Sequence, residues 1–162
     1  MVTSEITKGG ATPPQAPRFN PTDPKIQTGG NPLGPKILVI DDEPGVRASM
    51  YFTLKDQCQL TLASNAADGW KAFQEGQFDI VFCDIGLAGG AADQSGFPLF
   101  KKMQQHRPNQ ELVVFSGFVR ALSDEDKAKF RIPDDHFLDK PPNVADVRAL
   151  VQRFASKPKE LS

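Results

Sequence analysis

The chain has 162 residues, of which 39% are hydrophobic, and it carries 19 Lys and Arg against 20 Asp and Glu. This length allows one well-packed domain but not two ordinary ones. The net charge of −1 argues against direct nucleic-acid binding, and no apolar run approaches the roughly 18 residues of a membrane span. The N-terminus lacks a signal pattern, and Cys58 and Cys83 lack metal-ligand spacing. Together these features lead us to expect a cytoplasmic protein with reduced cysteines.

Residues 1–35 differ in composition from the rest of the chain. They hold seven of the 14 prolines and two glycine pairs, and their apolar residues are sparse and without period. A segment of this kind buries too little surface to offset its ordering entropy, which predicts a disordered tail. We place one folded domain at 36–157 and a short tail at 158–162, which leaves no room for an output domain.

From Lys36 onward, short apolar runs alternate with helical patterns. Runs rich in Val, Ile, Leu and Phe predict strands at 36–41, 59–64, 78–84, 111–116 and 136–139. Helices are expected at 44–56, from Asn65 to about 75, at 97–105, between Ser123 and Pro133, and at 144–155. Five such repeats predict an α/β fold, a doubly wound parallel sheet with helices on both faces.

Four of these strands end in a charged or hydroxyl side chain. Asp41 and Asp42 follow the first strand, and Asp84, Ser116 and Lys140 stand at the ends of three later ones. Because ligands of open parallel sheets bind at the carboxyl ends of the strands, these side chains should gather at one edge. Three carboxylates, a hydroxyl and an ammonium suit a divalent cation and a phosphoryl group.

The chemistry follows from the residue types. Mg²⁺ prefers oxygen ligands and keeps several waters, so a few carboxylates suffice to bind it. Asp84 is also a natural nucleophile, since a carboxylate that attacks a phosphoryl donor forms an acyl phosphate, and Lys140 would neutralise its charge. Alone, Asp41 and Asp42 could simply place a favourable charge at a helix N-terminus. The matching positions of Asp84 and Lys140 favour the functional interpretation.

Four segments, ILVIDDEP, IVFCDIGL, VVFSGF and HFLDKPP, resemble the signature blocks of the response-regulator receiver domain, as in the bacterial chemotaxis regulator. Their key residues follow one another at spacings of 42, 32 and 24. The resemblance covers about 36–156. It implies a flavodoxin-like fold, a five-stranded parallel sheet of order 2-1-3-4-5 with five helices.

The resemblance also implies roles for individual residues. Asp84 would be the phosphoacceptor, and Asp41, Asp42 and the backbone carbonyl of Gly86 would join it in binding Mg²⁺. Lys140 would pair with the phosphoryl oxygens.

Two further positions match the conformational switch of the family. Ser116 corresponds to the hydroxyl that moves toward the phosphoryl group, and Phe137 to the aromatic whose rotamer follows it. The bond between Lys140 and Pro141 is a candidate cis peptide. The loop after Asp84 departs from the family pattern, because its matching glycine is Gly96 and the loop is longer by about four residues. Such a loop could alter access to Asp84, hold a partner contact, or be a tolerated insertion.

These features favour a stand-alone receiver rather than a conventional enzyme. A histidine kinase or a phosphotransfer protein would phosphorylate it, and it would signal by binding a downstream protein that the sequence does not name. Two alternatives are a pseudo-receiver that binds partners without phosphorylation and a receiver fragment of a hybrid histidine kinase. An aspartyl phosphatase would need a D-x-D pair at a strand end, which neither Asp41-Asp42-Glu43 nor Asp84-Ile85-Gly86 provides.

Overall fold

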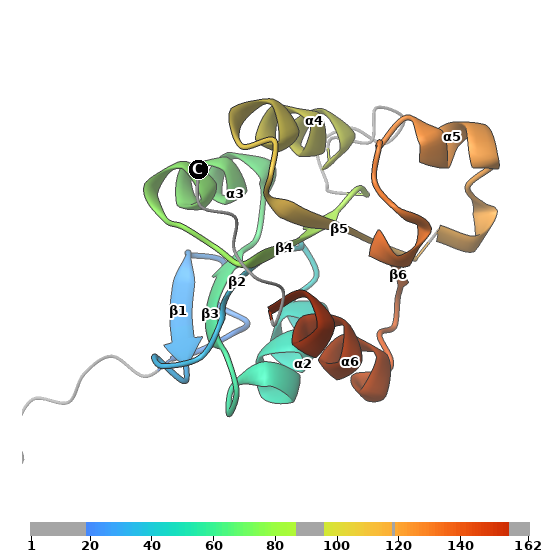
Figure 1. The fold of residues 1–162 in the computed structure, drawn as a ribbon. Coiled ribbons are helices and arrows are strands. Elements are labelled where there is room, and N and C mark those ends of the chain that lie inside the picture. The colour runs from blue at the N-terminus through green and yellow to red at the C-terminus, as the bar shows by residue number, and fades with distance from the viewer. Residues whose placement is uncertain (1–18, 87–95, 118, 156–162) are drawn as a thin grey trace, which may run out of the picture.

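The computed structural model describes residues 19–86, 96–117 and 119–155. They form three layers, with a sheet between two groups of helices (Figure 1). The strands lie in the order β1-β3-β2-β4-β5-β6. Their bounds are β1 Gln27–Gly30, β2 Lys36–Ile40, β3 Gln59–Ala63, β4 Ile80–Asp84, β5 Glu111–Ser116 and β6 Phe137–Asp139. Strands β2 to β6 are parallel, and β1 runs antiparallel to β3.

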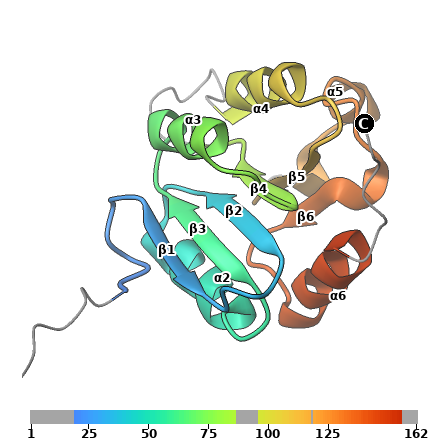
Figure 2. The same cartoon turned by 60° about the vertical axis from the view of Figure 1, so that its left-hand side comes forward.

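The helices cover both faces of the sheet (Figure 2). Their bounds are α2 Pro44–Leu54, α3 Ala66–Glu75, α4 Gly96–His106, α5 Asp124–Ala128 and α6 Val144–Ala155. Helices α2 and α6 pack on one face, and α3 and α4 pack on the other, with α5 on the same side. The predicted doubly wound sheet is therefore confirmed. Its five parallel strands lie in the order β3-β2-β4-β5-β6, which is the predicted order 2-1-3-4-5 when the parallel strands are numbered from β2.

The central strands explain the two-sided core. Ile37 and Val39 of β2 belong to the cluster under α2 and α6, whereas Leu38 and Ile40 belong to the cluster under α3 and α4. This alternation follows from the two-residue period of a strand. All four side chains are fully buried, so β2 must be apolar at every position after its exposed first residue, Lys36.

Side chains cap three of the predicted helices. Asn65 accepts a hydrogen bond from the amide of Asp68, and Ser123 accepts one from the amide of Asp126. Asn143 accepts one from the amide of Ala145 at the start of α6. These caps satisfy amide groups that have no partner within the helix, which explains why the predicted starts are close to the observed ones.

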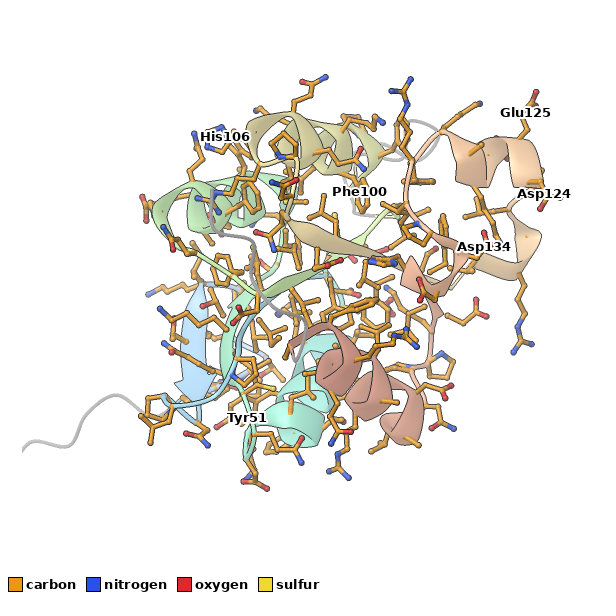
Figure 3. The ribbon with its side chains drawn as sticks, viewed as in Figure 1. Tyr51, Phe100, His106, Asp124, Glu125 and Asp134 are labelled. Atoms are coloured by element: carbon orange, nitrogen blue, oxygen red, sulfur yellow. The ribbon has the colours of Figure 1, made fainter. Side chains whose placement is uncertain are left out.

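Buried and exposed side chains separate clearly in the outer layers. Phe100 of α4 points into the core, and Asp124 and Glu125 of α5 point into solvent (Figure 3). Cys58 and Cys83 are buried and unbonded to each other, and burial raises the pKa of Cys58 to about 11. Both cysteines are therefore core residues. None of the described helices is both long and apolar enough to cross a membrane.

The prediction of a disordered tail is wrong for residues 19–35. β1 pairs with β3 from Gln27 to Gly30, so the sheet has six strands rather than five. The ring of Phe19 lies 4.1 Å from that of Tyr51. The composition of this segment predicted disorder wrongly, because the segment is held mainly by backbone hydrogen bonds, which do not depend on apolar content. Residues 1–18 and 156–162, including the predicted C-terminal tail, lie outside the described residues, as do 87–95 and Phe118.

Candidate functional site

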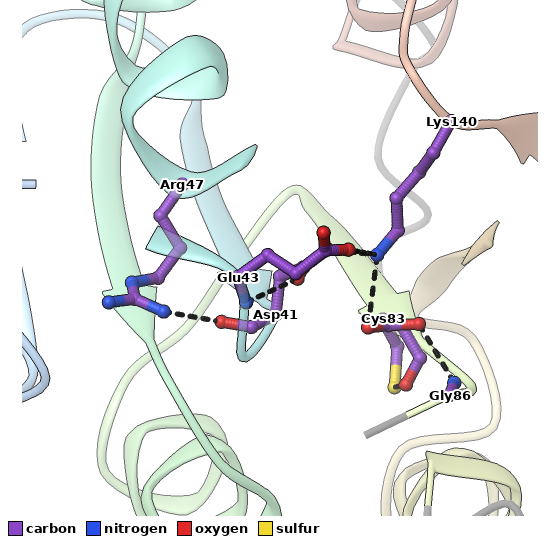
Figure 4. A network of polar contacts seen from close by, with 7 residues as sticks. Asp41, Glu43, Arg47, Cys83, Gly86 and Lys140 are labelled. Carbon is purple, nitrogen blue, oxygen red and sulfur yellow. Dashed lines mark hydrogen bonds and ion pairs between the residues drawn. The ribbon is translucent and has the colours of Figure 1, made fainter. Parts of the chain in front are cut away.

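Asp41, Gly86 and Lys140, which come from separate segments of the chain, lie close together at the carboxyl edge of the sheet (Figure 4). A cleft of about 530 Å³ opens there. Its lining comprises Asp42, Glu43, Val46, Asp84, Gly86, Ser116, Gly117, Lys140 and Pro141. Asp41 is buried beside this cleft and bonds to Lys140. The folding pattern of parallel strands therefore brings the separated sequence segments together, as expected.

Asp84 is held at both carboxylate oxygens. It ends β4 and is 3% exposed. Its Oδ1 accepts a hydrogen bond of 2.8 Å from the amide of Gly86, and its Oδ2 lies 3.0 Å from Nζ of Lys140. The side chain therefore has a fixed orientation at the cleft, in the place predicted for a nucleophile. The predicted role of the Gly86 carbonyl as a metal ligand stays a prediction.

Asp41 is fully buried, and its surroundings fix both the side chain and the backbone. Its Oδ1 accepts a hydrogen bond of 2.9 Å from the amide of Glu43, and its Oδ2 lies 2.7 Å from Nζ of Lys140. Its carbonyl oxygen accepts a 2.8 Å hydrogen bond from Arg47. Burial raises the pKa of Asp41 to about 6, because removal from water penalises the carboxylate more than these partners stabilise it.

Lys140 supplies positive charge to three carboxylates. Its Nζ lies 2.7 Å from Asp41, 3.0 Å from Asp84 and 3.0 Å from Glu43. Burial alone would lower its pKa, but the hydrogen bonds and charges of these carboxylates outweigh that effect and raise the pKa above its usual value. The ammonium is thus charged at any physiological pH. The bond to Pro141 is cis, as predicted.

The carboxylates form a cluster that fits a divalent cation. Ligand oxygens of Asp41, Asp42, Glu43 and Asp84 all lie within 4.8 Å of one another. Oxygen-only donors are the set that Mg²⁺ prefers, and Lys140 alone does not balance four carboxylates. Glu43 was missing from the predicted metal site, although its place directly after Asp41 and Asp42 was a usable signal.

The two residues of the predicted switch lie on neighbouring strands. In the register of β5 and β6, Ser116 faces Asp139 and Val114 faces Phe137. Ser116 and Phe137 therefore project from the same face of the sheet, two positions apart. Ser116 is 1% exposed at the cleft, and the half-buried ring of Phe137 lies 5.7 Å from that of Phe130. Their role as a switch stays a prediction.

Known proteins resemble this chain in sequence and in fold. Residues 37–152 match the response regulator receiver domain family. The chain is 27% identical over 128 residues to the DNA-binding transcriptional regulator NtrC of Bradyrhizobium sp., which covers 76% of this chain and 25% of that protein. It is 27% identical over 123 residues to the response regulator Rre1 of Synechocystis sp., covering 75% of this chain and 52% of that protein. The chain thus spans about a quarter and about half of these relatives.

Solved structures share the fold. The receiver domain of HemR from Leptospira biflexa aligns with a TM-score of 0.66 at 19% identity, covering 79% of this chain and 99% of that chain. A CheY-like receiver domain protein from Methanospirillum hungatei aligns with a TM-score of 0.60 at 21% identity, covering 74% and 92%. With the family match extending over more than half of the sequence, the chain belongs to the response regulator receiver domains of two-component systems.

Proposed function

We propose that this receiver accepts a phosphoryl group on Asp84 from a histidine kinase or a phosphotransfer protein, with Mg²⁺ as its cofactor. The observation that supports this most directly is the placement of Asp84. Its carboxylate lies at the cleft between the Gly86 amide and the Lys140 ammonium. A nucleophile held in one orientation loses little entropy when it reacts.

In the proposed reaction, a carboxylate oxygen of Asp84 forms a bond to phosphorus. The bond from phosphorus to the donor's histidine nitrogen breaks, and the imidazole leaves with the electron pair and takes up a proton. Phosphoryl transfer needs mainly alignment and charge neutralisation. Lys140 supplies one positive charge next to the phosphoryl oxygens, because its Nζ is already 3.0 Å from Asp84.

Asp41, Asp42, Asp84 and the Gly86 carbonyl would hold the Mg²⁺, and Glu43 adds a carboxylate at the cleft. When bound, the cation supplies the further positive charge that the transferring phosphoryl group needs. The protein contributes a buried Asp41 whose orientation is set before the cation arrives, through the Glu43 amide and Lys140.

The proposed output is binding of a downstream protein in the phosphorylated state, in the cytoplasm. A phosphoryl group on Asp84 would offer acceptor oxygens to the hydroxyl of Ser116, which lines the same cleft. A shift of Ser116 would change the space available to the ring of Phe137 on the same sheet face. Because Phe137 contacts Phe130, phosphorylation at the cleft would then alter the surface near Phe130.

Beryllofluoride, which imitates a phosphoryl group on a carboxylate, tests this proposal without a kinase. We expect it to shift amide resonances of Asp84, Ser116 and Phe137 only when Mg²⁺ is present. Asp84→Asn should abolish the shifts, and Asp126→Asn, on the exposed surface of α5, should keep them. A wild-type protein that binds Mg²⁺ without responding to beryllofluoride would instead be a pseudo-receiver.

A further inference from the structure

Arg47 joins the acidic site to the N-terminal part of the chain. Its side chain is 2% exposed, although it belongs to the first turns of α2. One of its N–H groups donates to the carbonyl of Asp41 at 2.8 Å. The others donate to the carbonyls of Thr22 at 3.2 Å and Pro21 at 3.4 Å. One guanidinium therefore contacts a predicted metal ligand and a distant segment at the same time.

The segment on the other side of Arg47 comprises residues 19–30, which we call the N-terminal segment. It runs along the outer edge of the sheet next to β3 (Figure 2). The tilted ring contact between Phe19 and Tyr51 holds one end, and the β1 pairing holds the other. Between them, the hydroxyl of Ser64 donates to the carbonyl of Pro24 at 2.7 Å. These contacts hold the carbonyls of Pro21 and Thr22 within hydrogen-bond distance of Arg47.

The burial of Arg47 makes these contacts energetically linked. A buried charge is stable only while its donors are hydrogen-bonded, and the Arg47 side chain is 2% exposed. If the N-terminal segment left its place, the guanidinium would lose the acceptors of Pro21 and Thr22. It would then turn toward water and release the carbonyl of Asp41, which is the next residue after β2.

We propose that Arg47 is a positioning residue for Asp41, and that the N-terminal segment sets the Mg²⁺ affinity of the acidic site through Arg47. This inference rests on the proposed function, in which Asp41 is a ligand of the cation. Thermodynamic reciprocity adds a second consequence. If the N-terminal segment strengthens Mg²⁺ binding, Mg²⁺ must stabilise the N-terminal segment by the same factor.

Phe19→Ala tests the coupling from a distance, because Phe19 touches α2 through Tyr51 and not the acidic site. We expect it to weaken Mg²⁺ binding about tenfold, the lower end of the effect of outer contacts on metal ligands. The matched control is Phe52→Ala, which removes an exposed ring that also packs on Tyr51. Titration of the full chain with MgCl₂, followed by amide resonances, should give wild-type affinity for this control.

A double-variant cycle tests whether Arg47 carries the coupling. Arg47→Met should weaken Mg²⁺ binding by a similar factor, and adding Phe19→Ala to it should cause little further loss. Arg47→Lys, which keeps one donor group, should restore part of the affinity. The control is Arg148→Met, because Arg148 donates to the carbonyl of Thr53 at the opposite end of α2.

Hydrogen exchange supplies a readout that a purely structural role would not move. In the wild type, saturating Mg²⁺ should slow exchange of the Asp23 amide and the β1 amides by about the same tenfold factor, as linkage requires. In Arg47→Met the added Mg²⁺ should leave these rates unchanged, even if all of them are faster than in the wild type.

The outcomes separate this inference from the proposed function. Equal Mg²⁺ affinity of wild type and Phe19→Ala would overturn the coupling and leave the proposed function intact. If the wild type binds no Mg²⁺, the proposed cofactor is wrong. The metal-free amide resonances of Asp41 and Glu43 then decide: a shift in Phe19→Ala but not in Phe52→Ala supports the link to Asp41, and no shift refutes it.

Discussion

At the scale of single residues, the site combines buried carboxylates with one shared ammonium. Asp41 and Asp84 are almost fully buried, and Lys140 lies within 3.0 Å of both. Burying several like charges costs stability unless a positive group compensates them. The acidic site therefore lowers the stability of the folded protein. Removing a negative charge there should raise the free energy of unfolding, and removing the positive charge should lower it.

Asp41→Asn should stabilise the protein at neutral pH. Burial raises the pKa of Asp41 from 3.8 to about 6, so the folded protein holds this proton more tightly than the unfolded chain does. The stability contributed by the proton is complete below pH 3.8 and is lost as the pH rises through about 6.

An Asn side chain has the size of the Asp41 side chain but does not deprotonate, so the variant does not lose this stability as the pH rises. The shift of the Asp41 pKa already includes the attraction to Lys140, and two pKa units are worth about 3 kcal/mol, so we expect a gain of up to about 3 kcal/mol at pH about 7. Urea denaturation over a pH series measures it. An Asn variant that loses as much stability as the wild type between pH 3.8 and about 6 would contradict the explanation.

Lys140→Met should have the opposite effect, because it leaves Asp41 and Asp84 without their shared cation. We expect a loss of about 2 kcal/mol in the free energy of unfolding, less than for a fully buried pair because Lys140 reaches the cleft. Lys129→Met is the control, since its pair with Asp126 is exposed and is worth less than about 0.5 kcal/mol. Equal losses in the two variants would contradict the central role of Lys140.

At the scale of elements, the start of α4 is packed directly against the end of β4. A Cβ at Gly96 would collide with the carbonyl oxygen of Asp84 and with Cα of Ile85. A larger residue cannot fit there without moving the backbone that carries the proposed phosphoacceptor. The close approach of these two backbones therefore requires a glycine at position 96.

Gly96→Ala should therefore lower the free energy of unfolding by about 2 kcal/mol, the range of overpacked sites. Gly45→Ala is a matched control, because a Cβ in this first turn of α2 would meet no atom within 4 Å. There the better helix former should raise stability by about 0.5–1 kcal/mol. Thermal and urea denaturation distinguish the two, and a neutral Gly96→Ala would show that β4 and α4 separate easily.

Most elements could be predicted because their signals are local. The buried runs of β2 and β4 and the caps at Asn65 and Ser123 depend on residue type alone. β1 has no such signal, since its sequence Gln-Thr-Gly-Gly is stabilised by pairing with β3. Arg47 was missed for a similar reason, because its acceptors are backbone carbonyls that any residue carries.

The site was predictable for a different reason. Parallel strands place their carboxyl ends at one edge, so order along the chain was enough to bring Asp41, Asp84, Ser116 and Lys140 together. Distances were not predictable in this way. That Lys140 contacts three carboxylates at once, including Glu43, depends on how β6 and α2 pack around the sheet.

At the scale of the whole molecule, Mg²⁺ binding should appear as stability. A ligand that binds only the folded state adds RT ln(1 + [L]/Kd), which is about 1.4 kcal/mol when its concentration is ten times the Kd. We expect MgCl₂ to raise the Tm of the wild type more than NaCl of equal ionic strength does. Asp42→Asn should reduce the difference, and an equal response to both salts would argue against a specific site.

Phosphorylation itself is the central claim, and intact mass spectrometry tests it most directly. The full chain is incubated with Mg²⁺ and a small phosphodonor such as acetyl phosphate, with Asp84→Asn treated in parallel. We predict the addition of one phosphoryl group to the wild type, its loss when Mg²⁺ is chelated beforehand, and none in Asp84→Asn. No addition to the wild type, or an equal addition to Asp84→Asn, would contradict the assignment of Asp84 as the phosphoacceptor.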